Sequence, residues 1–172
     1  MQRDIAEKTV RLHVVANSDS REDQEKKLQV RDAVLQKVGK LTENCTDAQE
    51  ARAVLKENLE GIEAAARTVC AEPITVSLQT EMFETRKYDT FTLPAGSYPS
   101  LRVQIGRAQG HNWWCVVFPS LCTAATSDGV EESARTGGFD DAEARLITGG
   151  EETYTFRFKT LEWLQAFFHL FD

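Results

Sequence analysis

The cysteines and histidines are the side chains of this sequence whose types and spacing could support catalysis. The chain holds four cysteines and three histidines. His111, Asn112 and Cys115 stand close together, and a cysteine hydrolase uses these three residue types. The thiolate of such an enzyme must lie beside its base. On an extended strand, residues 111 and 115 would be about 13 Å apart, too far for a hydrogen bond. We therefore expect Cys115 to be structural.

Metal and nucleotide sites have no better pattern in the sequence. Zinc sites use three or four Cys or His ligands at compact spacing, with CxxC or HxxxH as the usual sign. His111, Cys115 and Cys122 form neither pattern. No GxxxxGK[ST] phosphate loop and no GxGxxG motif occurs either. The sequence therefore predicts neither a metal site nor a cofactor.

A serine triad can be written around His13 and Asp19. The candidate nucleophiles are Ser18 and Ser20, which follow His13 within seven positions. Residues so close in sequence are poorly placed for triad geometry, and no GxSxG motif surrounds the serines. The sequence therefore predicts no catalytic residue.

The four cysteines limit the disulfides that the chain can form. Cys115 and Cys122 lie on either side of Pro119, which ends a strand and turns the chain. The pair could close a short disulfide loop or remain two thiols, and the sequence leaves both open. Cys45 and Cys70 flank a predicted helix of about 25 residues, roughly 37 Å long. Bridged Cα atoms lie within about 7 Å, so we expect no bond between Cys45 and Cys70.

A binding role is the better prediction for polar side chains that stand beside aromatics at strand ends. The candidates fall into two blocks: His13, Asn17 and Asp19 in the first, and Asn112, Trp113 and Trp114 in the second. Neighbouring residues on a strand point to opposite faces, so Trp113 and Trp114 need a cover on both faces. If the two strands are neighbours, the six residues could form one surface patch that anchors a protein partner. The alternative is that both tryptophans pack under helices while the asparagines cap turns.

The first block follows a predicted buried strand over residues 11–16, which is rich in β-branched residues. Turn and N-cap residues then begin a helix at Ser20, which we expect to end near residue 38 because Gly39 is a natural stop. A second helix is predicted over residues 47–69, with one apolar stripe.

The apolar period changes to two after Pro73 and predicts a half-buried strand over residues 74–82. Further strands are predicted over residues 87–93, 101–105, 112–118 and 153–159. The glycine-bearing segment 106–110 suits a hairpin that joins strands 101–105 and 112–118. Together these elements predict a single α+β domain over residues 1–172, with two helices from the N-terminal half packed on a mainly antiparallel sheet.

The C-terminal third divides into two segments of different character. Residues 123–150 are small, polar and acidic, which predicts a mobile excursion with one short helix around residues 141–146. Residues 161–171 are unusually apolar and predict a C-terminal helix. That helix could close the core, or it could present an aromatic surface to a membrane or a receptor.

Composition excludes several classes of function. The chain of 172 residues is 41% hydrophobic and 27% charged, with a net charge of −7. This charge argues against nucleic acid as a partner and against docking on anionic lipid by charge alone. No apolar run is long enough to span a membrane. The first residues, Met1 to Asp4, carry no apolar export segment.

Three blocks of the chain together resemble the stage II sporulation protein R family. They read RLHVVANSDS from position 11, with EDQ from 22 and LQVRDAV from 28, then YPSLRV from 98, and NWWCVVFPSLC from 112. The resemblance runs from about residue 10 to 158. It implies a secreted signalling protein of endospore-forming bacteria, whose export segment is either removed or upstream of this chain.

The resemblance also implies a partner and a place of action. Family members are made in the forespore and exported into the space between the two sporulation membranes. There they act on the external face of a membrane-embedded aspartic protease, which then removes the pro-sequence of sigma factor E. No small-molecule substrate is expected for such a ligand. The alternative from another class is a Cys- or Ser-dependent hydrolase that acts on peptide or cell wall in the same space.

Overall fold

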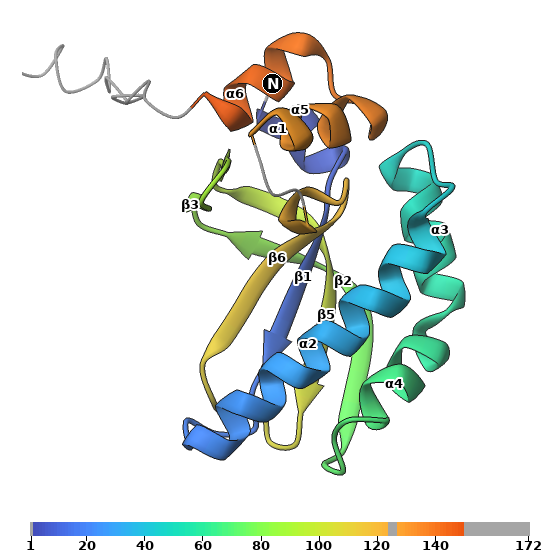
Figure 1. The fold of residues 1–172 in the computed structure, drawn as a ribbon, viewed down its shortest axis with the longest axis vertical. Helices are drawn as coiled ribbons and strands as arrows, with labels where there is room; N and C mark the ends of the chain where they lie inside the picture. Colours follow the sequence, from blue (N-terminus) through green and yellow to red (C-terminus); the bar gives the residue numbers. More distant parts are fainter. Residues whose placement is uncertain (1, 124–126, 150–172) are drawn as a thin grey trace, which may run out of the picture.

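A four-stranded sheet with three helices on one face forms the centre of the computed structural model, which describes residues 2–123 and 127–149 (Figure 1). The strands are β1 (Val10–Val15), β2 (Ile74–Phe83), β5 (Gly96–Ile105) and β6 (Asn112–Phe118), in the order β2-β5-β1-β6. β5 is antiparallel to β2 and parallel to β1, and β6 is antiparallel to β1. The sheet is therefore mixed but mainly antiparallel, and the predicted α+β class is confirmed.

The helices bury an apolar stripe against this sheet. They are α2 (Arg21–Thr42), α3 (Ala48–Glu57) and α4 (Leu59–Arg67). Valines at every fourth position of α2, from Val30 to Val38, are buried together with Leu12 and Val14 of β1. The side chain of Ser20 accepts a hydrogen bond from the backbone of Asp23 and so caps α2, as its position in the sequence predicts.

Two helix predictions in this region need correction. α2 continues past Gly39 to Thr42, because a glycine inside a helix costs only about 1 kcal/mol and the following turn is packed. The predicted single helix over residues 47–69 is two helices that meet at Asn58. The Asn58 side chain donates to the Val54 carbonyl, and its backbone N–H donates to Leu55, which ends α3.

The strand predictions were right for β1, β2 and β6, and two other predictions were wrong. Residues 87–93 are not one strand but a small hairpin, with β3 (Arg86–Lys87) paired to β4 (Thr92–Leu93). Strands 101–105 and 112–118 are not joined as a hairpin, because β1 lies between β5 and β6. Residues 106–111 instead cross the end of β1. The predicted strand 153–159 and helix 161–171 lie outside the described residues.

A second, smaller apolar cluster caps one end of the sheet. It brings together α1 (Gln2–Glu7), the β3–β4 hairpin, the 3₁₀ turn η1 (Leu121–Thr123), α5 (Ser127–Thr136) and α6 (Asp141–Thr148). Lys8, after α1, donates to Glu143 of α6 at 2.6 Å. The helix predicted around residues 141–146 is confirmed as α6, whereas α5 was not predicted. The mobility of residues 123–150 stays a prediction.

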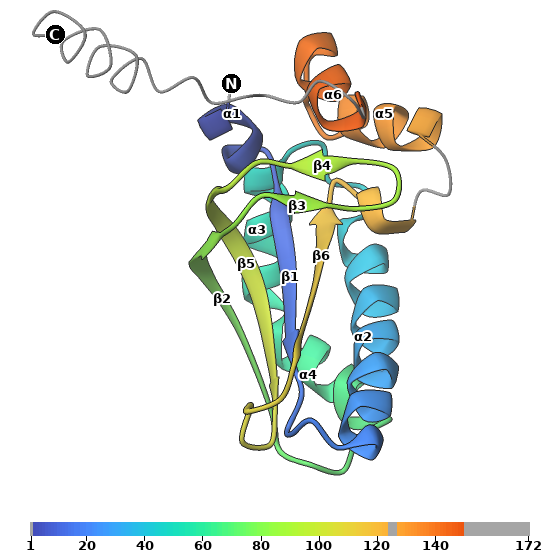
Figure 2. The same ribbon diagram turned by 90° about the vertical axis from the view of Figure 1, so that its left-hand side faces the viewer.

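The opposite face of the sheet is turned toward the viewer in Figure 2, where α2, α3 and α4 lie behind or beside the strands and the β3–β4 hairpin crosses the upper end. Within the described ranges, no helix is both long and apolar enough to cross a membrane. The face opposite the three helices is where polar and aromatic side chains from all four strands meet.

Candidate functional site: the polar face of the sheet

Alternate residues of each strand point away from the helices and build a surface that we name the polar face. It comprises Arg11, His13, Glu81, Phe83, Arg86, Tyr98, Arg102, Asn112 and Trp114. The neighbours of His13 along β1, Leu12 and Val14, belong to the core beneath the helices. Strand parity therefore separates the polar face from the core.

His13 lies at the middle of the polar face with both ring nitrogens bonded. Nδ1 lies 3.1 Å from a carboxylate oxygen of Glu81, and Nε2 lies 2.8 Å from the side-chain amide of Asn112. An amide can present its oxygen or its N–H group, so a neutral His13 ring satisfies both contacts. The residue is only 4% exposed. His13 is therefore a buried positioning group beneath the surface.

Glu81 connects His13 to the charge of Arg102. Nη1 of Arg102 donates to the same Glu81 oxygen at 2.9 Å. Burial by itself would raise the pKa of Glu81, but the Ser100 hydroxyl, His13 and Arg102 outweigh that effect and lower the pKa below its ordinary value. Glu81 is therefore held as a carboxylate near neutral pH.

Trp114 covers this network from the outside. Its ring stacks on His13 with centroids 3.6 Å apart and an angle of 21° between the planes. The edge of Phe83 contacts it with centroids 5.1 Å apart, and the guanidinium of Arg86 lies 5.6 Å from its centroid. Side chains from β1 and from the β2–β3 region, about 70 positions apart in the sequence, thus fix one orientation of Trp114.

Trp113 points to the other side of β6. It packs against the main core, with the guanidinium of Arg31 from α2 lying 5.0 Å from the centroid of its ring system. The prediction that Trp113 and Trp114 need a cover on opposite faces is confirmed. The alternative that both pack under helices is wrong for Trp114, since α2, α3 and α4 lie on the far side of the sheet.

Asn17 and Asp19 lie away from the polar face and hold a loop instead. Asn17 Oδ1 accepts the backbone N–H of Arg107 at 2.9 Å. Asp19 accepts the backbone N–H of His111 at 2.6 Å and also bonds its ring. These bonds from His111 lower the pKa of Asp19. The two residues fasten the 106–111 segment where it crosses the end of β1.

The structure therefore brings together His13, Asn112 and Trp114 of the six predicted residues, and it places Asn17, Asp19 and Trp113 elsewhere. A binding role for any of the six stays a prediction. The strands 11–16 and 112–118 are neighbours as supposed, with His13 opposite Trp114 and Val14 opposite Trp113.

Six residues of the polar face were missed from the sequence: the aromatic Phe83 and Tyr98, and the charged Arg11, Glu81, Arg86 and Arg102. A charged residue inside the apolar strand 10–15 was a usable signal for Arg11, because arginine is almost never fully buried without a reason. Glu81 could be assigned to the outward side of its strand, but its partners could not. Glu81 and His13 are 68 positions apart, a separation that no local pattern records.

None of the catalytic arrangements considered from the sequence is assembled here. Cys115 is bonded to Cys122 in a disulfide, with Cα atoms 6.2 Å apart, so its sulfur is no free thiolate. Cys45 and Cys70 are free and buried, and they are not bonded to each other, as expected. His13 contacts Glu81 and Asn112 rather than Asp19. No cluster of three metal-ligating residues occurs within 2–123 and 127–149.

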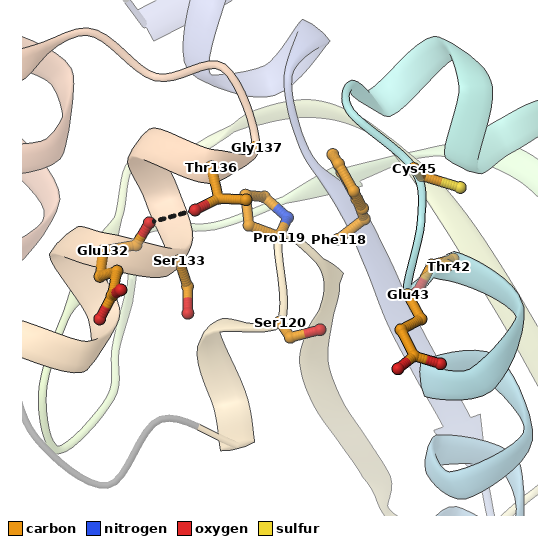
Figure 3. Close-up of a pocket in the computed structure, with 10 residues that line it drawn as sticks. All are labelled: Thr42, Glu43, Cys45, Phe118, Pro119, Ser120, Glu132, Ser133, Thr136 and Gly137. Atoms are coloured by element: carbon orange, nitrogen blue, oxygen red, sulfur yellow. Dashed lines mark hydrogen bonds between the residues drawn. The ribbon is translucent and has the colours of Figure 1, made fainter.

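A cavity of about 310 Å³ lies between the end of α2, the Phe118–Pro119 turn and α5 (Figure 3). Glu43 and Glu132 come from opposite walls, and the Thr136 hydroxyl donates to the backbone carbonyl of Glu132. The ten residues that line the cavity include no histidine, lysine or arginine. The cavity therefore offers no base paired with an acid, and the polar face remains the candidate site.

Comparison with known proteins gives the chain a family. The family model described as stage II sporulation protein R matches residues 6–128, which include β1, β2, β5 and β6. The stage II sporulation protein R of Bacillus subtilis (strain 168) is 35% identical over 130 residues, or 73% of this chain. The match spans 58% of that relative's length, less than two thirds of it. No solved structure matches the chain. The extent of these matches shows that the chain belongs to the stage II sporulation protein R family.

Proposed function

We propose that this protein is a secreted signal that activates a membrane-embedded aspartic protease, which in turn processes pro-sigma factor E. Membership of a sporulation protein family supports this role. The single structural observation that carries it is Trp114, which is partly exposed and is held by contacts with His13 and Phe83 on the sheet face opposite α2, α3 and α4. Aromatic side chains fixed in this way are typical anchors for a protein partner.

The proposed action is a shift of a conformational equilibrium. A ligand that binds the active form of a receptor more tightly than the inactive form raises the population of the active form. No chemistry by the ligand is needed for this effect. The bonded state of His13 and the disulfide at Cys115 accord with a ligand of this kind.

The proposed place of action is the space between the two sporulation membranes. Disulfides form and persist outside the reducing cytosol, so the Cys115–Cys122 bond supports an exported protein. Contact of residues 161–172 with a membrane remains part of the proposal. If a variant that lacks these residues keeps its localisation and does not aggregate, the proposed membrane contact is contradicted.

A reconstituted processing reaction tests the proposed function. Vesicles would carry the protease with its pro-sigma substrate inside, and the purified protein would be added outside. We expect cleavage of the substrate to depend on the added protein and to reach a plateau with its concentration. No cleavage with well-folded protein would contradict the proposal.

The same reaction separates the ligand from a hydrolase. A Cys115→Ser/His111→Ala variant removes the residues that a cysteine hydrolase would need. We expect this variant to activate as the unchanged protein does, at temperatures where circular dichroism shows it folded. Loss of activation in the folded variant would favour the hydrolase.

A further inference from the structure

The polar face carries an excess of guanidinium groups around its aromatic rings. Arg11 lies 3.9 Å from the centroid of Phe83, and Arg86 lies 5.6 Å from that of Trp114. Arg102 is the third arginine of this surface. Glu81 is its one carboxylate, and it is already bonded to both His13 and Arg102. Three cations therefore face one anion.

Arg11 is the least satisfied of these cations. It is fully buried, and Nη2 donates to the Tyr88 hydroxyl at 2.7 Å. Its Nε and Nη1 are buried and have no hydrogen-bond partner among the described residues. A buried charge without an ionic partner is costly, and the nearby rings of Phe83 and Tyr98 offset only a part of that cost. Arg11 thus adds positive charge beneath the face, where a partner does not reach it directly.

Arg102 has an unused donor as well. Its Nη1 reaches Glu81, but its Nε is buried and has no hydrogen-bond partner in the part of the chain that the structure describes. A guanidinium presents five N–H donors in a planar fork that matches a carboxylate, often through two parallel bonds. Arg86 lies exposed on β3, where it can meet a partner without any rearrangement.

This local excess of positive charge is opposite to the charge of the chain. The whole sequence has a net charge of −7. Such a protein is repelled by anionic lipid headgroups at long range, whereas a short acidic segment of a protein can approach one positive patch. Trp114 adds an apolar surface next to Arg86 and to His13, which favours a segment that also carries an apolar side chain.

We infer that the polar face binds a carboxylate-bearing, partly apolar segment of a protein partner. Arg86 and Arg102 form ion pairs with the carboxylates of this segment, and Trp114 packs against its apolar side chain. This inference rests on the proposed function for the identity of the receptor. The class of ligand rests on the residues of the face alone.

A binding measurement with a defined probe tests the class of ligand. The probe is a fluorescent synthetic peptide in which glutamate and phenylalanine alternate, and the readout is fluorescence anisotropy. An Arg86→Glu variant removes the exposed cation, and a Lys87→Glu variant of the neighbouring exposed residue changes the net charge equally. We expect Arg86→Glu to weaken binding at least tenfold and Lys87→Glu to weaken it less than twofold. Circular dichroism melting confirms that both variants fold.

Three outcomes would overturn the inference: no binding of the acidic peptide, equal loss in both variants, or stronger binding to phosphatidylglycerol vesicles than to the peptide. A peptide with lysine in place of glutamate should not bind. The processing reaction with the same variants separates this inference from the proposed function. If the peptide binds but no processing occurs, the inferred binding site is supported and the proposed function is contradicted. If processing occurs and Arg86→Glu does not change it, the proposed function is supported and the inferred binding site is contradicted.

Discussion

The His13 ring lies flat beneath the Trp114 ring, with centroids 3.6 Å apart, and both nitrogens of His13 are bonded to neighbours. Trp114 therefore packs on a histidine ring that cannot rotate without breaking two hydrogen bonds. A side chain held in its binding orientation loses little conformational entropy when a partner arrives. The buried Glu81–His13–Asn112 network thus serves the presentation of one surface tryptophan.

The stability of the fold should depend on Glu81 at acid pH. Its pKa is lowered in the folded state, where Arg102 and His13 bond the charged form, from an ordinary value of 4.5. The stabilisation is therefore present above about pH 4.5 and is lost as the pH falls through the lowered value. Urea unfolding at several pH values should show that the free energy of unfolding falls less steeply toward acid pH for Glu81→Gln than for the unchanged protein. Equal slopes for the variant and the unchanged protein would contradict the assignment.

Two glycines should respond in opposite directions to a change to alanine. Gly110 N–H donates to the Ala16 carbonyl, and a Cβ atom at Gly110 would collide with the backbone carbonyl of Ser18. We expect Gly110→Ala to lower the free energy of unfolding by about 2 kcal/mol. Gly39 lies inside α2 with nothing near its Cβ position, so Gly39→Ala should raise it by about 0.5–1 kcal/mol.

Urea unfolding of both glycine variants measures these two effects. An unchanged free energy of unfolding for Gly110→Ala would show that residues 106–111 are not closely packed where they cross β1. A destabilising Gly39→Ala change would contradict the extension of α2 beyond Gly39.

Removal of the disulfide should weaken the fold without ending activation. Cys115 and Cys122 close a loop of short sequence separation between β6 and η1. Their replacement by alanine should lower the free energy of unfolding by about 2 kcal/mol and the melting temperature by roughly 4–8 °C. Calorimetry with and without reductant measures the effect. An unchanged melting temperature for the unmodified protein in reductant would contradict a stabilising bond.

Local sequence patterns predicted the central elements of the fold well. The alternation of apolar residues after Pro73 indicated β2, and the N-cap residue Ser20 indicated the start of α2. The order of the strands was not predictable in this way. The parallel pairing of β5 with β1 depends on contacts between residues about 90 positions apart, such as Leu12 and Leu101. The break at Asn58 lies within a continuous apolar stripe and therefore left no gap in the pattern.

The candidate site was predictable only in part, for a related reason. The alternation of side chains required Trp113 and Trp114 to face opposite ways, but the side that the helices cover is decided by the whole sheet. Asn17 and Asp19 are typical turn residues and fulfil that role by bonding a loop about 90 positions away. Their polar character alone could not separate a turn from a binding surface.

The processing reaction with Trp114→Ala and Trp113→Ala tests the central claim most directly, namely that the polar face meets the receptor. We predict that Trp114→Ala raises the concentration for half-maximal activation about 30-fold, the equivalent of about 2 kcal/mol. Trp113→Ala should lower the free energy of unfolding by about 2–3 kcal/mol and leave that concentration unchanged while the protein is folded. Full activation by Trp114→Ala, or a loss confined to folded Trp113→Ala, would contradict the claim.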